Sequence, residues 1–197
     1  LTKEEDFVQD VFITTNHQSL LCFTNRGKVY NLKVYQIPEF GLRSRGKHFA
    51  NLINIESEER IVSVLTVAKY EEGLSIFSVT ERGYIKKTHL MAYANVRQSG
   101  IIGLRLDEGD ALVSCVIGCE EDDILIATRQ GKAIRFSSSD IRPMGRVSRG
   151  VTGIRFGESE DKVVGVEVLN HGTGEDTTIL SICENGYGKR SQTSEYR

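Results

Sequence analysis

Lysine and arginine residues gather in three intervals of this 197-residue chain, and few acidic residues lie among them. The interval between Gly83 and Gly100 contains no acid, and the other two contain one each. Ammonium and guanidinium groups bind phosphate oxygens, and duplex DNA carries a negative charge for every ~1.7 Å of its axis. The candidate DNA-binding residues, including three that lie just outside the intervals, are Lys28, Lys33, Arg43, Arg45, Lys47, Lys86, Lys87, Arg97, Lys132, Arg135, Arg142, Arg146, Arg149, Lys189 and Arg190.

The acidic residues collect elsewhere, so the formal net charge of −2 does not exclude a nucleic-acid partner. They form short runs at residues 56–59, 107–110, 120–123 and 158–161. In a radial repeat, this sorting predicts a basic rim and a separate acidic zone. The alternative interpretation is that these are ordinary solvated loop charges. Because no helix or ribbon carries Arg, Asn and Gln at base-reading spacing, we expect contacts to the DNA backbone that are independent of sequence.

No arrangement of residues typical of catalysis occurs in the chain. The four histidines are scattered, and no nucleophile motif, Walker loop or HExxH motif is present. Cys115 and Cys119 have the spacing of half a zinc site, but no second ligand pair accompanies them. The four cysteines, three of which lie in apolar runs, are expected to be reduced core residues. We therefore expect no catalytic residue, metal or cofactor in this segment.

The basic intervals belong to a repeated unit of about fifty residues. Each copy has an apolar run, an X-Gly turn and a run that carries Lys or Arg. Because glycine readily adopts a positive φ, these segments are predicted to be hairpins with two-residue turns. The turn glycines are Gly27, Gly83, Gly131 and Gly186. A second glycine follows in a polar setting in the first three units, at Gly46, Gly100 and Gly150.

Further strands are predicted after the second glycine and after the acidic turn of each unit. The first set covers residues 101–106 and 151–156, and the second covers 61–67, 111–117 and 163–169. Four strands per unit favour an all-β, propeller-like fold of four-stranded blades, since each small sheet must bury its faces against its neighbours. No segment has the periodicity of a helical solenoid.

The array is expected to be an incomplete one within a single domain. Complete units are predicted at residues 20–67, 74–117 and 124–169, and partial blades at 1–19 and 179–197. Residues 8–15 occupy the last-strand position of a preceding unit. The chain opens without Met or a leader and is interpreted as part of a longer protein, and no apolar stretch approaches the ~20 residues that span a bilayer.

Three runs resemble the C-terminal domain of DNA gyrase A, the larger-repeat partner in bacterial DNA gyrase. They are ENGYGKR at residues 184–190, GKVY with KVYQ at 27–36, and RGVTGIR at 149–155. The resemblance implies a six-bladed β-pinwheel in which blades exchange strands and a basic outer rim wraps DNA for negative supercoiling. It also implies a parent ATP-hydrolysing topoisomerase built from gyrase A and gyrase B, with ATP and Mg²⁺ bound elsewhere in that complex. Such a protein is expected in the bacterial cytoplasm, associated with the nucleoid.

One element of that family is absent from these residues. The basic gyrase box, Q-(R/K)-R-G-G-(R/K)-G, is only echoed by RSRGK at residues 43–47, and we expect the box to precede Leu1 in the parent chain. The related C-terminal domain of topoisomerase IV, which lacks an intact box, is therefore an alternative. A propeller-type platform for protein interaction, with no role in DNA binding, is a third interpretation.

Overall fold

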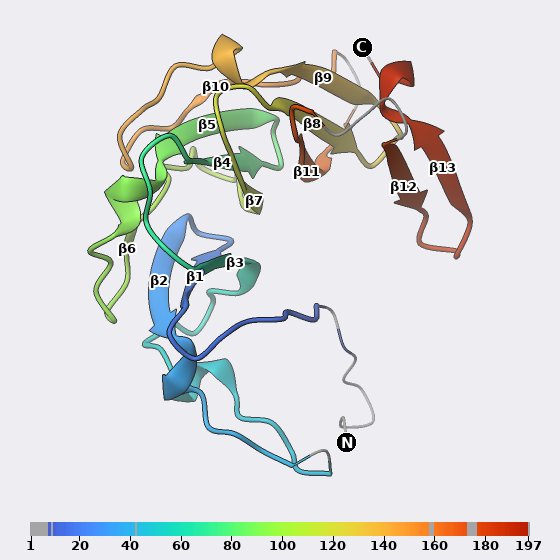
Figure 1. The fold of residues 1–197 in the computed structure, drawn as a ribbon. Helices are drawn as coiled ribbons and strands as arrows, with labels where there is room; N and C mark the ends of the chain where they lie inside the picture. The colour runs from blue at the N-terminus through green and yellow to red at the C-terminus, as the bar shows by residue number, and fades with distance from the viewer. Residues whose placement is uncertain (1–7, 9, 42, 158–159, 173–176, 197) are drawn as a thin grey trace.

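The computed structural model describes residues 8, 10–41, 43–157, 160–172 and 177–196. In these residues, regular structure consists of β-strands and 3₁₀ turns of three or four residues. The strands form four sheets that follow one another along an open arc (Figure 1). The predicted all-β fold of propeller-like blades is confirmed.

Each sheet is built on a hairpin that contains one of the four X-Gly turns. The two strands of a hairpin pair antiparallel, and both faces of the first two hairpins are largely buried. The hairpins are β1 (Ser19–Thr24) with β2 (Lys28–Lys33), β4 (Ser75–Thr80) with β5 (Tyr84–His89), β8 (Asp123–Thr128) with β9 (Ala133–Ser137), and β12 (Thr178–Ile182) with β13 (Gly188–Gln192).

The hairpin turns differ from the predicted two-residue turns, because three residues separate β1 from β2 and β4 from β5. Gly27 and Gly83 have φ angles of 73° and 84°, and each N–H donates to the carbonyl three residues earlier, at 2.9 and 3.0 Å. This is a type I turn followed by a left-handed glycine, a common three-residue hairpin loop. Gly131 and Gly186 have the same conformation, with φ of 82°.

The other strands of each sheet form its inner and outer edges. The inner strands β3 (Ile61–Val67), β7 (Leu112–Gly118) and β11 (Val163–Leu169) pair with β1, β4 and β8, and they face the hollow of the arc (Figure 1). The outer strands are β6 (Ile101–Ile102) and β10 (Val151–Thr152). β6 pairs with β2, and β10 pairs with β5, so each of the first two sheets takes its outer strand from the following unit. This exchange is the pinwheel arrangement that the family resemblance implied.

Two features differ from the predicted strand content. The third sheet has three strands in the described residues, β11, β8 and β9, rather than four. By analogy with β6 and β10, its outer strand would begin about 20 residues after Gly186, which is beyond Arg197. Residue 8 and residues 10–15 form no strand, although one was predicted there. A strand needs a paired neighbour, and no hairpin of the described chain lies in position to provide one.

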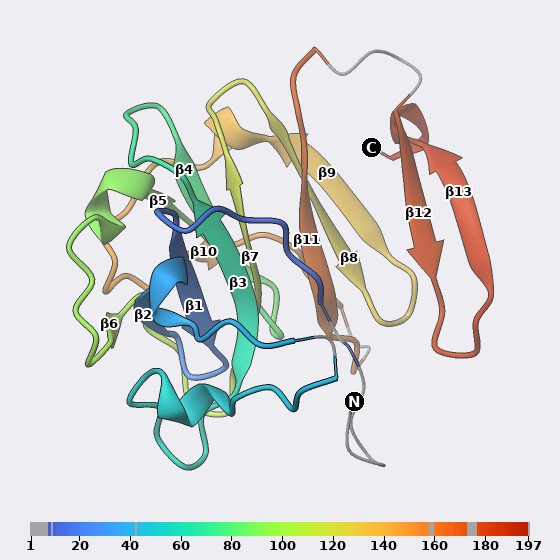
Figure 2. The same cartoon turned by 60° about the horizontal axis from the view of Figure 1, so that its bottom comes forward.

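Apolar side chains fill the spaces between successive sheets. Leu21 and Phe23 point from β1 into the core shared with the second sheet, while Leu20 and Cys22 point to the opposite face, as strand alternation requires. Phe77 and its neighbours form the corresponding core between the second and third sheets. The hairpin β12–β13 stands at the end of the row (Figure 2). Its Cys183 is exposed, so the prediction of a core cysteine is wrong at this position.

Candidate nucleic-acid interface

Two segments carry basic residues along the outer side of the arc. One connects the 3₁₀ turn η3 (Leu90–Tyr93) to β6, and the other connects η4 (Ser138–Asp140) to β10 (Figure 1). Arg97 lies exposed on the first segment. On the second, Arg142 and Arg149 are exposed and Arg146 is partly buried. The two segments touch, because the backbone N–H of Arg105 donates to the carbonyl of Ser148 at 3.3 Å.

Arg149 is held by one aromatic ring and one carboxylate. Its guanidinium lies 4.5 Å from the centroid of the Tyr84 ring, and its Nη1 lies 2.8 Å from Asp107 Oδ2. The next residue, Gly150, has a φ of 104°, and a Cβ there would lie 2.5 Å from the Ile85 carbonyl oxygen. Stacking orients the planar guanidinium, whose remaining N–H groups can bind a phosphate. Because both side chains of the ion pair are well exposed, a phosphate can compete with Asp107 at small cost.

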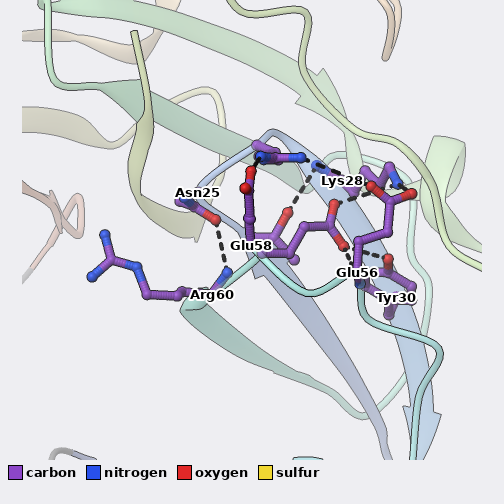
Figure 3. Close-up of polar contacts among 9 residues, drawn as sticks. Asn25, Lys28, Tyr30, Glu56, Glu58 and Arg60 are labelled. Carbon is purple, nitrogen blue, oxygen red and sulfur yellow. Dashed lines mark hydrogen bonds and ion pairs between the residues drawn. The ribbon is translucent and has the colours of Figure 1, made fainter. Parts of the chain in front are cut away.

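Lys28, in contrast, lies within a network of carboxylates (Figure 3). Its Nζ pairs with Glu56 and lies 3.4 Å from Glu59 Oε1. The hydroxyl of buried Tyr30 donates to the other oxygen of Glu59 at 2.7 Å. The hydrogen bond to Glu56 raises the pKa of Lys28. Lys28 is therefore already neutralised within its own sheet.

The acidic turns do not form a separate zone, which contradicts that part of the charge prediction. β3 runs antiparallel to β1, and Thr24 at the end of β1 pairs with Ile61 at the start of β3. The acidic turn before β3 therefore lies beside the hairpin turn after β1. Exchange of the outer strands brings later basic residues to the same turns. Besides the contacts of Lys28, the ion pairs that result are Arg26–Glu58 and Arg149–Asp107.

Lys86 and Lys87 lie in the interior rather than on a rim, with 0% and 1% of their surfaces exposed. They are on β5, which has β4 on one side and β10 on the other, and adjacent sheets and segments cover both of its faces. Burial lowers the pKa of Lys86 to about 8. In these positions the two ammonium groups cannot reach a DNA backbone, so the expectation of rim positions is wrong for both.

The remaining candidates fall into two groups. Three donate to neighbouring groups of the chain: Lys33 to Ser19 Oγ at 2.7 Å, Lys132 to the Phe156 carbonyl at 3.4 Å, and Arg135 to the Thr193 carbonyl at 2.9 Å, with a further ion pair between Arg135 and Asp123. The exposed candidates outside the two outer segments are Arg43, Arg45, Lys47, Lys189 and Arg190.

Two exposed arginines were not predicted to belong to the interface. Arg105 and Arg155 directly follow the outer strands β6 and β10. Each comes two residues after a glycine, Gly103 or Gly153, whose N–H donates to the carbonyl of a turn glycine at 2.8 Å. Their matching positions in two units are a signal in the sequence, because only a repeated unit places an arginine twice at the same edge.

A sequence profile of the DNA gyrase C-terminal domain, described as a β-propeller, matches four segments that together cover most of the chain: residues 18–68, 75–117, 122–170 and 178–197. The chain belongs to the DNA gyrase C-terminal domain family. Each matched segment contains the hairpin of one sheet, so the family repeat and the four sheets coincide.

Members of this gyrase family are similar over nearly the whole chain. DNA gyrase A of Escherichia coli K12 is 40% identical over 194 residues, which cover 98% of this chain and 22% of that protein. DNA gyrase A of Clostridium acetobutylicum is 44% identical over 152 residues, which cover 77% of this chain and 18% of that protein. The chain therefore spans about a fifth of the length of these relatives.

Two solved structures have the same fold. The C-terminal domain of a DNA topoisomerase IV superposes with a TM-score of 0.80 at 27% identity, covering 92% of this chain and 55% of that one. A DNA gyrase A C-terminal domain superposes with a TM-score of 0.76 at 25% identity, covering 93% and 57%. Both likenesses support the gyrase-type blade arrangement.

Two other kinds of site were sought in the described part of the chain. No group of three or more His, Cys, Asp or Glu side chains is placed there to hold a metal ion. No helix among the same residues is long and apolar enough to cross a membrane.

Proposed function

We propose that the outer side of the arc binds and wraps duplex DNA, independently of base sequence, in the service of negative supercoiling by a parent DNA gyrase. The observation that carries this proposal is the succession of Arg97, Arg142, Arg146 and Arg149 on two outer segments that contact each other. Membership of the gyrase family supports it. Arg105 and Arg155 extend the same edge and are included in the proposed interface.

An arc suits wrapping because the cost of bending is distributed. Smooth bending of a 20–30 bp duplex by 40–90° costs ~1–6 kcal/mol, and contacts along the bend must offset it. Cations that recur from one blade to the next provide such contacts along a curve, whereas a flat basic patch provides them at one place. The buried Lys86 and Lys87 and the carboxylate-bound Lys28 are not included among the phosphate contacts.

The parent protein is proposed to be the gyrase A component of an ATP-dependent topoisomerase, assembled with gyrase B in the bacterial cytoplasm at the nucleoid. ATP and Mg²⁺ would then act elsewhere in the complex. The likeness to a topoisomerase IV domain favours a second candidate, in which the parent is topoisomerase IV. Both candidates assign the same outer surface to DNA, and they differ in the parent enzyme.

Salt dependence of duplex binding tests this proposal. If ~4–6 phosphates are contacted, log K is expected to fall against log salt with a slope of roughly −3.6 to −5.4. Fluorescence anisotropy with two duplexes of unrelated sequence is the measurement, and both should give the same slope within error. Absence of binding at low salt would instead support the protein-interaction platform, and a strong preference for one duplex would contradict backbone recognition.

A further inference from the structure

Lys86 and Lys87 are unusual because fully buried lysines are rare and a buried charge is costly. Such groups persist where hydrogen bonds satisfy them. Both ammonium groups are satisfied, and most of the groups they bind are backbone carbonyls. The positions of those carbonyls show what the two lysines hold together.

Lys86 joins two chain segments that cross the outer side of the arc. Its Nζ donates to the Gly103 carbonyl, on the segment after β6, and to the Arg146 carbonyl, on the segment before β10. Tyr93 also donates to the Gly103 carbonyl, at 3.3 Å. A Cβ at Gly150 would lie 3.1 Å from Lys86 Cβ, so the backbone of the second segment passes closely over this lysine.

Lys87 holds the beginning of the same basic segment. Its Nζ donates to the Ser138 carbonyl at 3.0 Å, in the first residue of η4, and it pairs with Glu120. Its own backbone carbonyl accepts from the N–H of Met144 at 2.8 Å. The two lysines therefore contact residues 138, 144 and 146, on either side of Arg142 and close to Arg149.

We infer that Lys86 and Lys87 are positioning residues, whose buried ammonium groups anchor residues 138–150 to the second sheet and so place Arg142, Arg146 and Arg149 on the outer side. The anchoring stands on geometry alone. Its consequence for DNA rests on the proposed function.

A repeated contact supports this role. Arg135 occupies the position of Lys87 in the third unit, four residues after the turn glycine. It donates to the carbonyl of Thr193, the first residue of η5 (Thr193–Glu195), at 2.9 Å. In both units a cation of one hairpin thus binds the 3₁₀ turn of the next unit. Asn31 takes this position in the first unit, and its Oδ1 is buried without a hydrogen-bond partner among the described residues.

Hydrogen exchange of the variant Lys86→Met tests the anchoring without DNA. Methionine fills similar space but donates no hydrogen bond, so amides of residues 144–153 are expected to exchange at least ~10-fold faster. Amides of the hairpin β1–β2 should be unchanged. Lys69→Met is the matched control, since Lys69 is 79% exposed. Lys87→Met should loosen the same segment, and Lys86→Gln serves if Lys86→Met fails to fold. Unchanged exchange at 144–153 in both lysine positions would overturn the anchoring.

The salt dependence of DNA binding tests the consequence. A lysine that contacts one phosphate changes the slope by about 0.9 when it is removed. A lysine that positions three arginines should change it by more, roughly 1.8–2.7 in Lys86→Met, while thermal unfolding shows the variant to be folded. A change of only ~0.9 with unchanged exchange would mean direct phosphate contact and overturn the inference. Faster exchange with no DNA binding by the wild type would refute the proposed function while the anchoring stands.

Discussion

Simultaneous replacement of Arg142, Arg146 and Arg149 with alanine is expected to weaken duplex binding roughly 100-fold at low salt. Each charge-assisted contact to a phosphate contributes on the order of 1 kcal/mol, and about 2.7 kcal/mol corresponds to a factor of 100. The slope of log K against log salt should become shallower by roughly 2.7, since three phosphate contacts are lost. Both values come from titrations with two unrelated duplexes, which should be affected equally.

The control for this variant removes the same charge from another part of the surface. Arg60, Arg82 and Arg129 are exposed and flank the acidic or hairpin turns. Their triple replacement with alanine is expected to reduce affinity severalfold at most, through the general field of the domain. Equal losses in the two triple variants would show that net charge, rather than the outer segments, determines binding.

Gly83→Ala is expected to destabilise the fold much more than Gly131→Ala. Both glycines have a left-handed conformation, with φ of 84° and 82°, which costs an alanine ~1–2 kcal/mol. At Gly83, a Cβ would also lie 2.6 Å from the Ile154 carbonyl oxygen, whereas at Gly131 no atom lies within 4 Å. Overpacking adds ~1–3 kcal/mol, and it displaces the segment whose residues Gly153 and Ile154 donate to the Gly83 carbonyl.

Urea denaturation followed by circular dichroism measures this difference. We expect the unfolding free energy to fall by about 2–5 kcal/mol in Gly83→Ala and by about 1–2 kcal/mol in Gly131→Ala. Gly27→Ala should behave like Gly83→Ala, because a Cβ at Gly27 would lie 2.4 Å from the Leu104 carbonyl oxygen. Equal losses at Gly83 and Gly131 would mean that the exchanged segment does not press on the hairpin turn.

The hairpins and the repeat could be predicted from local chemistry. Glycine at positive φ, alternating apolar residues and their recurrence about every fifty residues are visible without any tertiary information. The exchange of outer strands could be inferred only from the family resemblance. β6 and β10 are two residues long, and which hairpin they pair with depends on how successive units are placed in space.

The candidate interface was predicted less completely than the fold. Position in a repeat indicates similar radius, but it does not indicate whether a side chain points outward. Lys86 and Lys87 occupy the same strand positions as Tyr30 and Asn31 of the first unit, where Tyr30 is also fully buried. Lys28 is neutralised by carboxylates that come 28 and 31 residues later in the chain, and only the register of β1 with β3 reveals this. Arg142 and Arg149 lie on the outer side as predicted, and their contact with DNA stays a prediction.

Bending of a bound duplex is the most direct measurement of the proposed function. A ~40 bp duplex labelled at both ends, longer than the 20–30 bp sites considered above, reports its end-to-end distance by fluorescence energy transfer. At saturating protein and low salt, the wild type is expected to shorten this distance. The triple variant lacking Arg142, Arg146 and Arg149, brought to saturation at higher concentration, should shorten it less. An end-to-end distance that is unchanged when the duplex is saturated with wild-type protein would contradict wrapping on the outer side of the arc.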